Sequence, residues 1–185
     1  MRFVLASASP RRREILAQLG YTFSVHCSNA PEDNVEGDIA DVVKTLASRK
    51  AESIAPTEND ALIIAADTLV GLNGRKLGKP KDSADAFEML SALSGNIHEV
   101  TTGICLINTR NGKQLLASDT TYVEFKRLSA SEINEYIATG EPMDKAGSYA
   151  IQGGAAKFVK QYTGSYDNIV GFPSELFIKM LAEME

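Results

Sequence analysis

Two serines and three consecutive arginines stand close together near the N-terminus, in the segment Ser7–Arg13. They follow a short apolar run at 3–6 and precede a predicted helix whose first residue is Pro10. A helix N-terminus offers unpaired N–H groups and a positive dipole end, and arginine adds forked donors that match phosphate oxygens. Three cations there oppose the helix dipole and favour a nearby anion. Two interpretations stay open: a phosphate cradle, or capping serines with solvated arginines.

A carboxylate interrupts the apolar run at 61–72, ALIIAADTLVGL, at Asp67. A charge in such a strand is costly unless it is paired, hydrogen-bonded or bound to a metal. Strand alternation places Asp67 and Leu69 on one face and Thr68 on the other. Asp67 is therefore either a structural carboxylate, paired with a buried lysine or backbone amides, or a functional group.

The segment 140–154, GEPMDKAGSYAIQGG, contains five Gly or Pro residues together with Asp144, Lys145 and Gln152. Such a loop is costly to order, and loops of this kind often carry binding residues. It is not a nucleotide-binding P-loop, because GxxxxGK[ST] occurs nowhere in the chain. GxGxxG and the GxSxG of serine hydrolases are absent too. Taken singly, Glu32, Lys50 and Lys79 are typical of ordinary solvated side chains.

The composition is that of a folded domain with a modest negative charge. The chain has 185 residues, 44% hydrophobic and 23% charged, and a net charge of −5. This length predicts one domain, or at most two small lobes, with a real core. The negative balance argues against binding nucleic acid through bulk charge but leaves a small anionic ligand open.

Cysteine usage and apolar runs indicate a cytoplasmic protein. Cys27 and Cys105 fit no metal-binding spacing, which predicts two reduced core cysteines, and His26 and His98 do not complete a zinc site. The apolar stretch after Arg2 is too short for a secretory signal, which needs about 7–15 apolar residues. No run reaches the roughly 18 apolar residues of a membrane span.

The elements that must position these residues alternate between strands and helices. Strands are predicted at 3–6 and 61–72, in two runs within 97–127, and near 156–162 and 167–171. Helices are predicted at about 10–19, 39–54, 83–95 and 129–140, with a last one starting at Pro173. Hairpin turns are predicted at Asn73-Gly74 and Asn111-Gly112. This order predicts an α/β or α+β fold with a mixed sheet.

Six motifs, SASPRRREIL, AADTLV, LGKP, HEVTTG, GEPMDKAGSYAIQG and GSYDNIVGFP, occur in the order and spacing of the Maf family, and the chain resembles that family from residue 3 to about 174. Maf members are nucleoside triphosphate pyrophosphatases. The resemblance implies one Maf-like domain over 1–185, with a mixed twisted sheet flanked by helices. It also implies two lobes around a central cleft, as in inosine triphosphate pyrophosphatases (Maf/Ham1), and a divalent metal, Mg²⁺ or Mn²⁺.

The resemblance also implies roles for individual residues. Asp67 matches the proton acceptor, and Glu32 with Asp67 the metal position. The triphosphate residues correspond to Ser7, Ser9, Arg12, Lys50 and Lys79. Pro31 and Gly78 depart from residues common in relatives and leave the number of metal ligands open.

The resemblance further implies that three positions, Arg11, Thr68 and Gln152, set base specificity, and their residue types match the branch acting on dTTP and UTP. The branch resembling 7-methyl-GTP pyrophosphatases has Trp, Gln and Glu there, and this sequence has no tryptophan. The expected activity is hydrolysis of dTTP and UTP to the monophosphate and pyrophosphate, with modified pyrimidine nucleotides also open. Alternatives are a 7-methyl-GTP-type enzyme or a nucleotide-binding regulator of septum formation. We expect no nucleic-acid or membrane partner, and a homodimer stays open.

Overall fold

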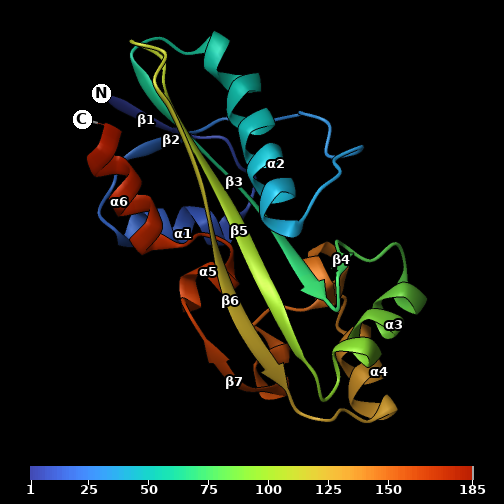
Figure 1. Ribbon diagram of the computed structural model, residues 1–185. Coiled ribbons are helices and arrows are strands. Elements are labelled where there is room, and N and C mark those ends of the chain that lie inside the picture. Colours follow the sequence, from blue (N-terminus) through green and yellow to red (C-terminus); the bar gives the residue numbers. More distant parts are fainter. Residues whose placement is uncertain (185) are drawn as a thin grey trace. The chain divides into compact units, whose positions relative to one another are not determined.

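The computed structural model describes residues 1–184 and has the mixed α/β architecture that the sequence predicts (Figure 1). The strands are β1 (Arg2–Leu5), β2 (Phe23–Val25), β3 (Ala61–Leu72), β4 (Arg75–Leu77), β5 (Ile97–Asn108), β6 (Gln114–Phe125) and β7 (Val159–Thr163). The α-helices are α1 (Pro10–Gln18), α2 (Ile39–Ile54), α3 (Ser83–Leu93), α4 (Ala130–Ala138), α5 (Tyr166–Val170) and α6 (Ser174–Met184). Short 3-10 helices include η2 (Glu141–Asp144) and η4 (Gly154–Phe158).

The strands form a seven-stranded mixed sheet in the order β2-β1-β3-β5-β6-β7, with β4 paired to β3. β1 runs parallel to β2 and to β3, whereas β4 and β7 pair antiparallel with β3 and β6. The parallel pairs are joined through helices, and the antiparallel pair β3–β4 is joined by a two-residue turn. That turn is Asn73-Gly74, both with positive φ (50° and 77°), as a type I′ hairpin requires.

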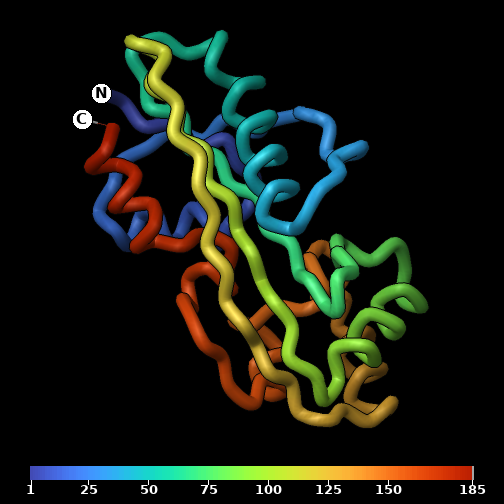
Figure 2. Tube along the Cα trace, in the orientation of Figure 1, coloured from blue at the N-terminus to red at the C-terminus, as the bar shows by residue number. Residues whose placement is uncertain are grey.

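The chain divides into two compact units. Unit 1 comprises Met1–Thr68, Thr102–Asp119 and Gly171–Glu185, and unit 2 comprises Leu69–Thr101 and Thr120–Val170. Figure 2 shows how segments that are distant in sequence make up each unit. β3, β5 and β6 contribute residues to both.

Unit 1 is built on β1 and β3, whose alternating residues face different helices. Val4, Ile63 and Ala65 pack with Ala47 and Ala51 of α2 in one buried cluster. On the other face, the Tyr21 ring lies 5.3 Å from the ring of Phe3 and 5.5 Å from that of Phe177 in α6. This period of two means that neighbouring β3 residues have different helical partners.

Unit 2 has an aromatic core. The rings of Phe125, Tyr149, Phe158 and Tyr136 pack edge to face, and the His98 ring packs edge to face against both Phe125 and Tyr149. Helix α4 begins with the predicted capping box, in which Ser129 and Glu132 bond each other's backbone N–H groups. Capping and ring packing together fix the helix from which the segment 140–154 continues.

Three short elements differ from the sequence prediction. The strand expected at 167–171 is the helix α5. Its Asn168 is buried and donates its backbone N–H to Ser165 Oγ. The Asn168 side-chain amide donates to the Val100 carbonyl and to Thr121 Oγ1. A strand there would lose these bonds. β2 was not predicted, and the strand expected at 156–162 begins only at Val159.

Cys105 is buried as predicted, but Cys27 is exposed, so the expectation of two core cysteines is wrong for Cys27. Across residues 1–184, none of the helices has the length and apolar character needed to cross a membrane.

Candidate active site

In unit 1, the ammonium of Lys50 bridges two carboxylates. Its Nζ lies 2.5 Å from Oδ1 of Asp67 and 2.7 Å from Oε1 of Glu32. The Lys50 and Asp67 side chains are only 13% and 11% exposed, whereas that of Glu32 is 56% exposed. The cluster therefore opens toward solvent on the Glu32 side, so it is not sealed as a purely structural ion pair would be. The sequence allowed a buried lysine as the partner of Asp67, and that lysine is Lys50.

Arg12 is held by unit 1 on several sides. Its Nε donates to the Gly171 carbonyl at 2.8 Å, and its terminal nitrogens donate to Ser7 Oγ at 3.3 Å and Thr68 Oγ1 at 3.0 Å. Burial lowers the pKa of Arg12, partly offset by the charges of Asp67 and Glu32. Arg12 is therefore not the solvated arginine of the second interpretation. The fork has five N–H groups, so these bonds leave donors for a ligand.

Ser7 and Ser9 differ in the contacts that their side chains make at the start of α1. Ser9 occupies the N-cap position of α1, but its side chain makes no capping hydrogen bond, so the side-chain capping of the second interpretation is not seen at Ser9. The hydroxyl of Ser7 instead accepts the Ser9 N–H at 3.2 Å as well as the Arg12 contact. Arg11 is half-buried, and its charge contributes to lowering the pKa of Arg12.

The predicted alternation along β3 is confirmed by the partners of its neighbouring residues. Asp67 binds Lys50 of α2, and Thr68 binds Arg12 of α1. Thr68 Oγ1 also lies 2.9 Å from Thr102 Oγ1. One strand thus places a carboxylate and a hydroxyl toward different helices, and the structure brings together Ser7, Arg12, Glu32, Lys50, Asp67 and Thr68.

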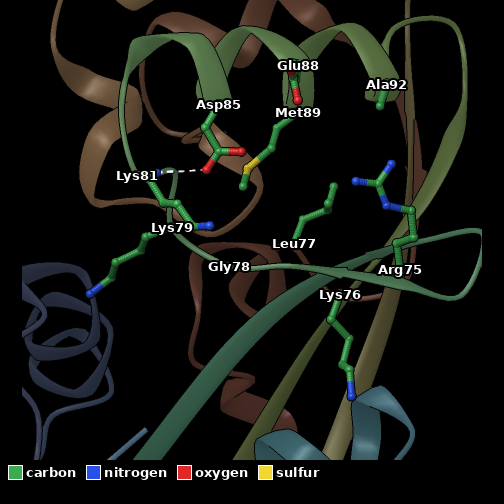
Figure 3. Close-up of a pocket in the computed structure, with 10 residues that line it drawn as sticks. All are labelled: Arg75, Lys76, Leu77, Gly78, Lys79, Lys81, Asp85, Glu88, Met89 and Ala92. Carbon is green, nitrogen blue, oxygen red and sulfur yellow. Dashed lines mark hydrogen bonds between the residues drawn. The ribbon is translucent and has the colours of Figure 1, made fainter. Parts of the chain in front are cut away.

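Lys79 and Gln152 belong to unit 2, where both are exposed. The Gly147 N–H donates to the Gly78 carbonyl at 3.0 Å, which ties the Lys79 segment to the segment 140–154. A cavity of about 320 Å³ lies between β4 and α3 and includes Lys79 in its lining. Figure 3 shows Lys79 pointing away from Asp85 and Met89, so its ammonium is not directed at the α3 side of this cavity.

Comparison with known proteins identifies the family. The sequence model of the family described as Maf-like protein matches residues 2–184. The chain belongs to the Maf family. The predicted family resemblance is therefore confirmed.

Maf relatives similar to this chain include proteins named dTTP/UTP pyrophosphatase. That of Pelotomaculum thermopropionicum is 48% identical over 179 residues, covering 96% of this chain and 94% of the relative. That of Clostridium novyi is 44% identical and covers 100% and 98%. Among solved structures, the Ham1 protein of Staphylococcus aureus has a TM-score of 0.57 over the full length of both chains at 15% identity. This likeness confirms the Ham1-like fold.

The site contains two carboxylates, the type of ligand that a hard divalent cation prefers. Mg²⁺ usually takes one or two carboxylates and fills its other positions with water and phosphate oxygens. Glu32 and Asp67 supply two carboxylates around one cationic group. Within residues 1–184 there is no cluster of three or more His, Cys, Asp or Glu side chains suited to a metal. Glu32 and Asp67 therefore fit a divalent cation that would take water and phosphate oxygens at its remaining positions.

Gly171 and Thr102 belong to this network but were not singled out from the sequence. Gly171 has φ +113°, and a Cβ there would meet Thr68 Oγ1 at 3.2 Å. Both residues stand in recognised motifs, GSYDNIVGFP and HEVTTG. Their partners could not be found from the sequence, because Arg12 and Gly171 are 159 positions apart.

Proposed function

We propose that this Maf protein is a nucleoside triphosphate pyrophosphatase that hydrolyses dTTP and UTP to the nucleoside monophosphate and pyrophosphate. The observation that carries the proposal is the cluster of Asp67, Lys50 and Glu32 within the same unit as the Arg12 fork. Near-full-length relatives named dTTP/UTP pyrophosphatase, 44% and 48% identical, support the same substrates.

The reaction needs a base next to a phosphate-binding surface. A water oxygen attacks the α-phosphorus, the bond from the α-phosphorus to the bridging oxygen breaks, and pyrophosphate leaves. Asp67 takes the proton of that water or orients it as a general base. Lys50, at 2.5 Å from Asp67 Oδ1, balances the carboxylate charge and fixes its direction.

The triphosphate carries several negative charges, and the leaving pyrophosphate gains more. Arg12, Ser7 and Ser9 supply donors at the start of α1, and Lys50 and Lys79 supply positive charge. Arg12 is pre-organised by three protein acceptors, so little side-chain entropy is lost when a phosphate binds to its remaining donors.

Glu32 and Asp67 would hold the divalent cation, Mg²⁺ or Mn²⁺. When bound there with the phosphates, the cation supplies charge neutralisation. Glu32 is the more exposed of the two and the freer to reorient.

Base selection is assigned to Arg11, Thr68 and Gln152. The Gln152 amide presents one acceptor and two donors, which suits a uracil or thymine edge that presents both kinds of group. Gln152 is exposed, so its amide is available to a ligand. The hydroxyl of Thr68 contacts both Arg12 and Thr102. A residue assigned to base selection is therefore hydrogen-bonded to the arginine assigned to phosphate binding.

A nucleotide panel tests the proposal. Wild-type protein is given dTTP, UTP, CTP, dGTP and 7-methyl-GTP with Mg²⁺ or Mn²⁺, and pyrophosphate and monophosphate are measured. We expect both products in equal amounts, fastest from dTTP and UTP. Preference for 7-methyl-GTP would assign the chain to the other branch. Binding of dTTP without pyrophosphate release would favour the regulator and refute the proposal.

A further inference from the structure

Gln152 is presented by a tight turn in unit 2. The Gly153 N–H donates to the Ala150 carbonyl at 3.1 Å, which closes a turn from Ala150 to Gly153. Ala150 and Ile151 are 5% and 8% exposed, whereas Gln152 is exposed. The first half of the turn is therefore buried, and it fixes the position from which the exposed Gln152 side-chain amide extends.

Tyr136 of α4 holds the start of this turn. Its hydroxyl accepts the Ala150 N–H at 3.1 Å, and the side chain is buried among aromatic residues, with its ring 5.3 Å from that of Phe158. The same ring bounds the other end of the turn, because a Cβ at Gly154 would meet it at 3.1 Å. A buried phenol of this kind has little freedom to move, so Ala150 is fixed relative to α4.

Glu141 of η2 holds the end of the turn. Its Oε2 accepts the Gly154 N–H at 2.9 Å. Its carboxylate also fills the space beside Gly153, since a Cβ at that residue would fall 1.8 Å from Oε1. The absence of a side chain at Gly153 is therefore what allows Glu141 to reach the Gly154 backbone.

We propose that Tyr136 and Glu141 are positioning residues for base selection: they clamp the two ends of the Ala150–Gly153 turn and so fix the Gln152 amide. This inference rests on the proposed function, in which Gln152 contacts the base. A donor–acceptor pattern discriminates between bases only if its direction is fixed before the ligand arrives, because a mobile amide adapts to several partners. Neither residue needs to touch substrate for this role.

The test compares variants that remove one clamp each. Tyr136→Phe removes the acceptor for Ala150 but keeps the ring, and Glu141→Ala removes the acceptor for Gly154. Glu141→Gln keeps a carbonyl acceptor and serves as the conservative rescue. Glu132→Ala is the matched control, because it removes the α4 capping box without contact to the turn.

The readouts are the ratio of kcat/KM for dTTP to that for dGTP, and the hydrogen exchange of the Ala150 and Gly154 amides. In Tyr136→Phe and Glu141→Ala we expect the ratio to fall about three- to tenfold, the effect of one lost hydrogen bond, with faster exchange of the released amide. Glu141→Gln and Glu132→Ala retain the wild-type ratio. An unchanged ratio in both clamp variants, or an equal fall in Glu132→Ala, would overturn the inference.

Gly153→Ala gives an independent arm. Its new Cβ displaces the Glu141 carboxylate, so it should lower the ratio as Glu141→Ala does, and the two changes should not add when combined. Additive effects would contradict the shared contact. Wild type and Gln152→Ala report on the proposed function itself. If Gln152→Ala loses dTTP selectivity while Tyr136→Phe and Glu141→Ala keep it, only the positioning role is refuted.

Discussion

Replacing Asp67 by Asn separates the two roles that a buried carboxylate can have. Asn is nearly isosteric, and its carbonyl oxygen can still accept the Lys50 N–H that now reaches Oδ1 at 2.5 Å. Lys50 also keeps its contact with Glu32. The substitution therefore removes a charge and a proton acceptor while leaving the surrounding packing in place.

The expected magnitudes differ between the roles. A hydrogen bond to a charged group contributes about 1.5–3 kcal/mol, and Asn keeps part of it, so we expect a loss of about 1–2 kcal/mol of unfolding free energy. For a chain of this size that lowers Tm by roughly 2–8 °C. Loss of a general base lowers kcat by about 10²–10⁴-fold. A protein with a typical stability of about 5–15 kcal/mol stays folded at 25 °C after such a loss, so a change of that size in kcat cannot come from unfolding.

The assay measures kcat for dTTP with Mg²⁺ at 25 °C alongside thermal unfolding. Asp60→Asn is the matched control, since Asp60 is 57% exposed in unit 1 and its ion pair with Arg110 lies at the surface. We expect near-wild-type kcat in the control and a loss of at least about a hundredfold in Asp67→Asn. A lower Tm with near-native kcat would refute the catalytic role and leave Asp67 as the structural partner of Lys50.

Three further predictions follow from the contacts and pKa shifts. Arg12→Lys keeps the charge but loses the fork, so the KM for dTTP should rise and the unfolding free energy should fall by about 1–3 kcal/mol; an unchanged KM with reduced stability would make Arg12 purely structural. Burial raises the pKa of Cys105 to about 11, so a thiol reagent at pH 8 should modify only Cys27 in the native protein and both cysteines in urea; two fast native thiols would contradict this. Burial lowers the pKa of His98 to about 4, below the roughly 6.5 that it has in the unfolded chain. The neutral buried imidazole therefore makes its full contribution to the free energy of unfolding above about pH 6.5. About 3 kcal/mol of that free energy is lost as the pH falls toward 4. Urea unfolding at pH 7 and 4.5 should show this loss in wild type and a smaller one in His98→Gln.

Long periodic elements and their caps could be predicted from the sequence because local signals determine them. Helix 39–54 has the predicted bounds, and Ser129 with Glu132 forms the predicted capping box. The helix at 167–171 could not be predicted in this way, because it depends on hydrogen bonds from Asn168 to Val100 and Thr121, which are remote in sequence. Short apolar runs give no period by which to distinguish a strand from a buried helix.

For the site, the residue types were predictable and their partners were not. A carboxylate in an apolar strand indicates that a cation lies nearby, but several lysines could supply it, and only the fold selects Lys50. Likewise, three adjacent arginines look alike in sequence. The helix turns Arg12 toward the Ser7 and Gly171 oxygens, whereas Arg13 stays exposed with a longer contact to the Ala8 carbonyl at 3.4 Å.

Two hydrogen-bond partners of Arg12 lie where the chain passes from one unit to the other. The chain passes between the two units directly after Thr68 and directly before Thr102 and Gly171. Arg12 binds the Thr68 hydroxyl and the Gly171 carbonyl, and Thr68 bonds in turn to Thr102. The arginine proposed to bind phosphate thus organises, from within unit 1, three residues at which the chain enters or leaves that unit. A phosphate bound by the remaining donors of Arg12 would therefore share one guanidinium with the Thr68 hydroxyl and the Gly171 carbonyl.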